Sequence, residues 1–155
     1  MKKTNVIRSL DQKKIPYTLF QLENAQGLSG SEVARAQNQD IERVFKTLVT
    51  VGKSGNHYVY MVPVDEELDL KKAAKAAGEK SIEMIKSKEL LPLTGYIHGG
   101  CSPIGMKKQF PTFIDSCAED FEKIYFSAGE IGMQVEMSFE DFKKVIKVES
   151  KDVII

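Results

Sequence analysis

The densest group of residues that could do chemistry lies between Gly95 and Gly105, where the sequence is GYIHGGCSPIG. This stretch holds four of the 11 glycines of the chain. Glycines let a backbone approach a ligand closely and point successive N–H groups inward, which suits a carbonyl oxygen or an anion. Gly99 and Pro103 also form a GxxxP pattern, in which the proline stiffens one end of the loop. On spacing alone, a plain structural loop is an equally good interpretation.

Cys101 lies three residues after His98 in this stretch, and that pair invites a second interpretation. A thiolate beside an imidazolium is an activated nucleophile. The alternative is a small side chain packed under a glycine loop. No carboxylate at a suitable spacing could orient His98, so we favour the packing role for Cys101.

Lys46 is the third candidate, because it stands at the start of an apolar run, between Phe45 and Thr47-Leu48-Val49. A lysine in such a place usually extends its stem along the apolar surface and keeps its ammonium in water. The periodicity does not distinguish Lys46 from Lys53 or Lys80.

The composition of the chain limits the classes of function that these residues could have. The chain has 155 residues, 42% of them hydrophobic, which suits one ordinary domain. Its 22 basic and 22 acidic residues exclude a generally basic surface, so any RNA contact must come from a local patch. No apolar run approaches the roughly 20 residues of a membrane span, and the charged start MKKTNVIRSLDQKK lacks the apolar segment of a secretory signal. We therefore expect a cytoplasmic protein without a membrane partner.

The sequence contains no recognisable metal-binding or nucleotide-binding motif. The two cysteines, Cys101 and Cys117, form no CxxC pair and are expected to be reduced thiols. The two histidines, His57 and His98, are 41 positions apart with no ligand spacing around both. Neither a GxxxxGK[ST] nor a GxGxxG motif is present. We therefore expect no metal and no cofactor.

Cap residues and apolar periodicity predict helices and strands that alternate along the whole chain. Helices are expected after Thr4, Ser29, Asp69 and Ser138, with a short one from Ser87 to Leu91 and a further capping-box spacing at Ser116 and Glu119. Strands are expected over 17–22, 45–51, 58–62, 112–115, 123–127 and 133–137. This alternation predicts one α/β domain over residues 1–155, with a mixed sheet and peripheral helices.

Several long segments go beyond such general patterns. They are FKTLV (45–49), LDLKKAAKAAG (68–78), TGYIHGGCSPIGMKK (94–108), FPTFID (110–115) and the SxGxxG of 127–132. In this order and spacing they resemble the YbaK/EbsC family of Cys-tRNA(Pro) deacylases, which are trans-editing relatives of the editing domain of bacterial prolyl-tRNA synthetase. The resemblance covers nearly the whole chain. It implies an α/β fold around a mixed, barrel-like β-sheet surrounded by helices.

The resemblance also implies an activity and a site. The activity removes cysteine mistakenly attached to tRNA(Pro), so mischarged Cys-tRNA(Pro) is the substrate and prolyl-tRNA synthetase an expected partner. The residue matching Lys46 lies near the 3′-terminal adenosine in that family, and the matching GxxxP loop holds the aminoacyl carbonyl through backbone N–H groups. The implied catalytic residues are Lys46, Gly99, Gly100, Cys101 and Ser102, and the implied substrate-binding residues are Thr47, Pro103, Ile104, Gly105, Ser127 and Gly129.

The chain departs from the family pattern at three places. Glu130 and Ile131 replace a basic pair, which puts a tRNA-phosphate contact there in doubt. Leu22 matches a frequent tyrosine at the end of the first strand, so the role of that tyrosine is not carried over. Cys101 stands where relatives can have an aliphatic residue, which argues further against a nucleophile.

A cysteinyl ester carries its own nucleophile, which explains why the site needs no acid–base pair. The substrate thiol can attack its own carbonyl and expel the tRNA as a cyclic thioester, a lyase-type cleavage; otherwise the enzyme is an ester hydrolase. Lys46 could raise the thiolate fraction, stabilise the departing ribose oxygen or hold the terminal phosphate. Two alternatives remain: an inactive tRNA- or synthetase-binding module of the same fold, and a thiol hydrolase that depends on Cys101.

Overall fold

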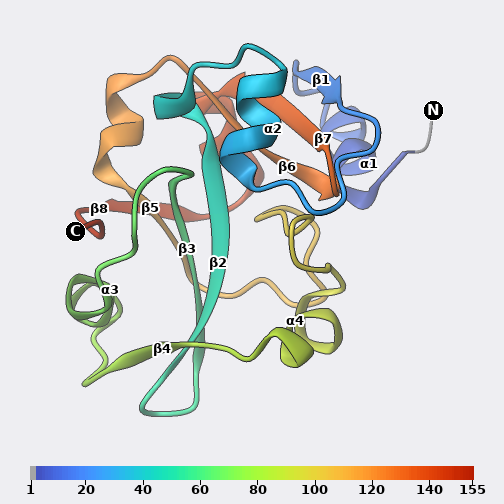
Figure 1. Ribbon diagram of the computed structural model, residues 1–155. Coiled ribbons are helices and arrows are strands. Elements are labelled where there is room, and N and C mark those ends of the chain that lie inside the picture. The colour runs from blue at the N-terminus through green and yellow to red at the C-terminus, as the bar shows by residue number, and fades with distance from the viewer. Residues whose placement is uncertain (1–2) are drawn as a thin grey trace.

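The computed structural model describes residues 3–155, so the first two residues of the charged start lie outside the described part. The chain forms two sheets, one antiparallel and one mixed, with helices packed around them (Figure 1). The expected mixed α/β class is confirmed. The barrel-like arrangement is corrected, because both sheets are open: strand order is β1-β7-β6 in one and β4-β2-β3-β5-β8 in the other.

The three-stranded sheet is antiparallel throughout. It consists of β1 (Thr18–Gln21), β6 (Lys123–Glu130) and β7 (Met133–Ser138), with β7 in the centre. The β6–β7 register is interrupted between Ser127 and Glu130. Helices α1 (Asn5–Gln12) and α5 (Phe139–Val145) bury apolar side chains against this sheet, as in the contact between the Phe126 and Phe142 rings at 5.0 Å.

The five-stranded sheet is built on a hairpin of β2 (Phe45–Gly52) and β3 (His57–Pro63). On one side β4 (Ile82–Met84) extends it; on the other, β5 (Thr112–Asp115) and β8 (Val148–Lys151) add parallel strands. Helix α3 (Leu70–Ala77) covers one face, where the Tyr60 hydroxyl donates to the Ala73 carbonyl at 2.7 Å.

The main hydrophobic core fills the space between the two sheets. Phe45, Val49 and Met61 reach it from the five-stranded sheet, and Phe126 and Val135 reach it from the three-stranded one. A parallel bridge, Val44 to Tyr125, connects the two sheets. This connection brings the start of β2 beside β6, and it is the junction where the candidate site lies.

Local signals in the sequence located most of the helices correctly. Thr4, Ser29, Asp69 and Ser138 cap α1, α2 (Gly30–Ala36), α3 and α5, and the Ser29–Glu32 capping box is complete. Helix α4 (Ser87–Thr94) is three residues longer than the expected 87–91 segment. At Ser116 the element is a 3₁₀ turn, η2 (Ser116–Asp120), whose cap is Asp115. A second 3₁₀ turn, η1 (Ile41–Arg43), leads into β2.

The edge of β2 positions the site. Strand β4 pairs only with Thr50–Gly52, so it does not cover the first half of β2. Successive residues of a strand point to opposite faces, and an uncovered edge exposes backbone groups as well. No helix within residues 3–155 is long and apolar enough to cross a bilayer.

Candidate functional site

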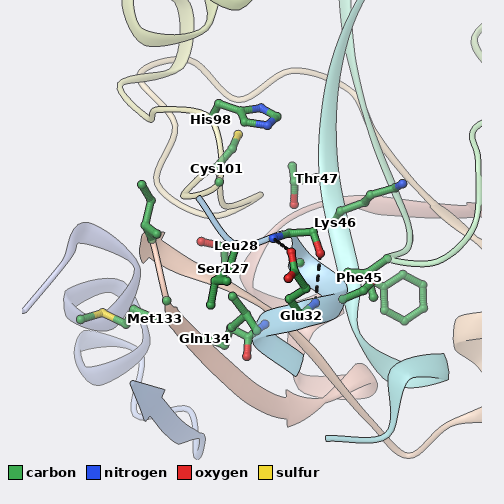
Figure 2. Close-up of a pocket in the computed structure, with 18 of the residues that line it drawn as sticks. Leu28, Glu32, Phe45, Lys46, Thr47, His98, Cys101, Ser127, Met133 and Gln134 are labelled. Atoms are coloured by element: carbon green, nitrogen blue, oxygen red, sulfur yellow. Dashed lines mark hydrogen bonds between the residues drawn. The ribbon is translucent and has the colours of Figure 1, made fainter. Parts of the chain in front are cut away.

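A cavity of about 580 Å³ opens between the uncovered part of β2, the start of α2, the glycine-rich loop (residues 95–105) and the β6–β7 hairpin. Figure 2 shows these walls with their side chains. Among the residues expected from the sequence, Lys46, Thr47, Gly99, Cys101 and Ser127 line it. Segments that are far apart in the sequence therefore line the same cavity.

The glycine-rich loop is held in place by Tyr96. The Tyr96 side chain is 7% exposed, and its hydroxyl donates to the Ile104 carbonyl at 2.5 Å. A Cβ at Gly105 would lie 2.8 Å from that hydroxyl, and one at Gly129 would lie 3.2 Å from the Tyr96 ring. Both glycines have φ values near +80° to +103°, which L side chains rarely adopt. Gly105 and Gly129 therefore let the loop close on the ring.

The loop presents free backbone donors at the cavity. Gly99, at φ +87°, is the third residue of a turn in which the Gly100 N–H donates to the Ile97 carbonyl at 3.0 Å. Within residues 3–155 the N–H groups of Gly99 and Cys101 have no acceptor. Such donors suit an oxygen that gains negative charge, so the expected carbonyl-binding role has suitable groups at these two positions.

The rest of the loop supports this arrangement without lining the cavity. Ser102 is fully buried, and its hydroxyl accepts from the Ile104 N–H at 3.3 Å. Pro103 is buried, and Ile104 belongs to the main core. The structure therefore does not bring Gly100, Ser102, Pro103, Ile104, Gly105 or Gly129 to the cavity wall.

Gly100 packs directly on the β6–β7 turn. A Cβ there would lie 3.1 Å from the Glu130 carbonyl carbon and from the Ile131 nitrogen. Ile131 in turn lines the cavity. At this position the chain therefore supplies an apolar wall. Leu22 is tied to the same hairpin, since its N–H donates to the Gly132 carbonyl at 2.8 Å, but it does not line the cavity.

Lys46 and Thr47 project to opposite sides of β2. Thr47 pairs with Met61, whose side chain lies in the main core, whereas Lys46 pairs with Val62, which lies in the cluster under α3. Figure 2 shows the Lys46 side chain running from β2 away from His98 and Cys101. Lys46 contributes to the wall of the cavity, but its ammonium lies on the far side of the strand from the loop.

Thr47 carries an unpaired polar atom. Its Oγ1 is buried and has no hydrogen-bond partner within residues 3–155. Buried polar groups nearly always have a hydrogen-bond partner, so an unpaired one at a cavity wall is unusual. A ligand group in the cavity would supply the missing partner.

Cys101 is poorly suited to act as a nucleophile. It is 8% exposed, and burial raises the pKa of its thiol to about 12. The thiol is therefore protonated at neutral pH, and only a thiolate attacks efficiently. This agrees with the packing role favoured from the sequence.

The β6–β7 hairpin adds two polar groups, of which the sequence indicated one. The Ser127 hydroxyl accepts from the Gly129 N–H at 3.1 Å, and Gln134 is its partner across the hairpin. Gln134 is 8% exposed and accepts from Gln37 through its amide oxygen at 3.0 Å, which leaves its amide nitrogen as a donor at the wall. A glutamine on an otherwise buried strand was the signal that could have found it.

The start of α2 was also missed as part of the site. Residues 27–33 line the cavity opposite the glycine-rich loop, and Glu32 there is engaged with the Ser29 N–H at 2.9 Å. That hydrogen bond lowers the pKa of the Glu32 carboxyl. Within residues 3–155 no cluster of three potential metal ligands occurs. The cavity is therefore a site of backbone donors, hydroxyls and apolar walls.

Comparison with known proteins agrees with this geometry. The family model of the aminoacyl-tRNA editing domain matches residues 25–145. EbsC of Enterococcus faecalis, described as a candidate Cys-tRNA(Pro)/Cys-tRNA(Cys) deacylase, is 48% identical over 139 residues, which are 89% of this chain and 85% of that protein. A proline–tRNA ligase of Thermosipho africanus is 32% identical over 77 residues, which are 50% of this chain and 14% of the ligase.

Solved structures share the fold. The crystal structure of a candidate trans-editing enzyme for prolyl-tRNA synthetase superposes with a TM-score of 0.86, at 21% identity, over 97% of this chain and 95% of that one. At this identity the likeness concerns the fold alone. It confirms the α/β architecture expected from the sequence.

Proposed function

This chain belongs to the aminoacyl-tRNA editing domain family, and we propose that it removes cysteine from mischarged Cys-tRNA(Pro), and also from Cys-tRNA(Cys). The observation that carries the proposal is a cavity lined both by the first half of β2 and by Gly99 and Cys101, whose N–H groups have no acceptor within residues 3–155. The enzyme would act as a single editing domain in the cytoplasm, where charged tRNA is used.

The reaction proceeds through the substrate thiol. The cysteinyl sulfur attacks the ester carbonyl carbon, the bond to the ribose oxygen breaks, and cysteine leaves as a cyclic thioester that water then opens. Charge develops on the carbonyl oxygen, to which the Gly99 and Cys101 N–H groups, free of acceptors within residues 3–155, would donate. One such donor is typically worth roughly 10²–10³ in rate. Cys101 thus contributes its backbone, while its thiol packs in the wall.

The position of Lys46 supports one of the three roles considered for it from the sequence. Its ammonium lies on the other side of β2 from the loop (Figure 2). It is therefore distant from the position proposed for the substrate thiol. This favours a contact with the departing ribose or the terminal phosphate, which lie outside the acyl pocket. Lysine serves such anions as a mobile point charge on a flexible stem.

The thiol requirement also gives selectivity. A pocket distinguishes side chains that differ by a methylene by only about 1–3 kcal/mol, so size alone would spare correctly charged Pro-tRNA(Pro) poorly. Proline and alanine lack a thiol and cannot cleave themselves. The partner that presents the tRNA is proposed to be prolyl-tRNA synthetase, since the net charge of this chain is +0 and its own affinity for RNA is expected to be weak.

The test is a deacylation assay on purified protein. Cys-tRNA(Pro) should lose its amino acid, while Pro-tRNA(Pro) and a seryl-tRNA(Pro) should not. Loss of serine at the same rate would refute the thiol route. Release of none of the three, with binding of tRNA or synthetase retained, would instead identify an inactive module of the same fold.

A further inference from the structure

We propose that His98 is the proton acceptor for the substrate thiol, an inference that rests on the proposed deacylation. His98 lines the cavity on the glycine-rich loop, next to the free N–H group of Gly99. Figure 2 shows its imidazole ring projecting from the loop toward β2, beside the Cys101 side chain. The ring is therefore placed on the same wall as the donors that would hold the reacting carbonyl.

His98 is free to accept a proton. The residue is exposed at the rim, and neither ring nitrogen has a hydrogen-bond or ion-pair partner within residues 3–155. An imidazole nitrogen without a partner can accept a proton, and histidine is the side chain that most often serves as a general base.

The other titratable groups around the cavity are committed elsewhere. Glu32, on α2, is held by the Ser29 N–H and is a weak base because its pKa is lowered. Cys101, in the same loop as His98, is a thiol with a raised pKa. Lys46, on β2, extends away from the loop. Glu130, in the turn packed on Gly100, does not line the cavity.

The proposed step is balanced without a further reactant. An imidazole nitrogen of His98 takes the S–H proton as the sulfur forms its bond to the carbonyl carbon. The bond to the ribose oxygen breaks with its electron pair, and solvent protonates that oxygen while the imidazolium returns its proton to solvent. Deacylation at neutral pH then no longer depends on the small fraction of thiol that ionises by itself.

The test compares pH profiles of single-turnover deacylation of Cys-tRNA(Pro). About 3% of a thiol with a pKa near 8.5 is ionised at pH 7, so His98→Gln should slow the reaction roughly 10- to 30-fold there. At pH 9.5 the substrate thiol ionises unaided, and the deficit should shrink to about 2-fold or less. Added imidazole should restore part of the rate of His98→Ala at pH 7, because the position is exposed.

The chain offers a matched control in its second histidine. His57 stands at the start of β3, 5.5 Å from the Phe110 ring by centroids, and does not line the cavity. His57→Gln should therefore follow the wild-type profile. An equal deficit of His98→Gln at pH 7 and 9.5, or no deficit at either, overturns the proposal. Failure of the proposed function shows itself differently, as absence of cysteine release by the wild type at every pH, and it overturns this inference as well.

Discussion

Lys46 and Thr47 are neighbours in sequence but belong to different sides of β2: Thr47 pairs with Met61 over the main core and Lys46 pairs with Val62 under α3. The cavity at the uncovered edge of the strand touches both. One edge can therefore offer a hydroxyl to the acyl group and a cation to the phosphate-bearing end of the same substrate.

Lys46→Ala should lower kcat/KM for Cys-tRNA(Pro) by about 10- to 100-fold, the worth of one charged hydrogen bond of roughly 1.5–3 kcal/mol. The effect should appear mainly with intact tRNA and be small with a cysteinyl ester that lacks the terminal phosphate, because the Lys46 side chain extends from β2 away from the loop that would hold the acyl group. Lys53→Ala, in the β2–β3 turn, is the control and should be unaffected. Equal losses on both substrates would place the ammonium at the ester after all.

Thr47→Val should separate stability from activity. The Oγ1 of Thr47 is buried without a partner, and an unpaired buried hydroxyl costs about 1–3 kcal/mol. Replacing it by a methyl group of similar shape should raise the free energy of unfolding by about 1 kcal/mol, measured in urea. Substrate binding should weaken, seen as a higher KM. A variant that is both less stable and fully active would contradict the role of the hydroxyl as a ligand group.

How far the sequence could predict this fold depends on the range of the signals. Caps such as Ser29 and Asp69 act on the next turn of chain, and those helices were located correctly. Strands β4 and β8 were missed, because they have only three and four residues and exist through pairing with β2 and β5. Short edge strands carry too little local pattern to be recognised.

The candidate site also has parts that the sequence predicted and parts that depend on contacts between distant residues. The family resemblance located Lys46 and the loop at Gly99, which the fold brings to one cavity. It could not show that the Lys46 ammonium extends away from that loop, or that α2 and Gln134 complete the walls. Those facts depend on how the two sheets meet at Val44 and Tyr125, a contact between residues far apart in the chain.

Gly100→Ala should disturb the loop donors without touching the cavity directly. The added Cβ would meet backbone atoms of Glu130 and Ile131 at 3.1 Å, and neither can rotate away as a side chain could. The loop must shift by a few tenths of an ångström, which should cost about 1–3 kcal/mol of stability, the usual range for overpacking. Deacylation should fall at least 10-fold, since donors to a developing oxyanion depend on placement. Circular dichroism and single-turnover rates on the same sample measure both.

Cys101→Ala tests the thiol-hydrolase alternative. Burial raises the pKa of this thiol to about 12, so below about pH 11 it is a neutral packing group. The variant should keep its rate within about 2-fold and lose about 1 kcal/mol of stability, as for removal of one small buried group. Iodoacetamide should modify Cys101 only slowly in the folded protein, with Cys117→Ala used to isolate its signal. Loss of activity in Cys101→Ala without loss of fold would revive that alternative.

The hydroxyl of Tyr96 should make the protein sensitive to alkaline pH. Burial raises the pKa of Tyr96 from an ordinary 10.0 to about 12. Between these values the unfolded chain has lost the phenolic proton while the folded chain keeps it, so unfolding releases a proton and higher pH favours unfolding. The contribution is fully present below pH 10 and is lost as the pH rises toward 12. Urea unfolding at pH 8, 10 and 11 should therefore show a falling midpoint.

Tyr96→Phe should reduce this alkaline slope and also cost about 1 kcal/mol at pH 8, because the Ile104 carbonyl loses its donor at 2.5 Å. Part of the slope should remain, since burial also raises the pKa of Cys101 from 9.0 to about 12. The double variant Tyr96→Phe/Cys101→Ala should therefore be the least sensitive to pH between 9 and 11. Identical slopes for the wild type and Tyr96→Phe would mean that the Tyr96 hydroxyl is not held protonated by the loop that closes on it.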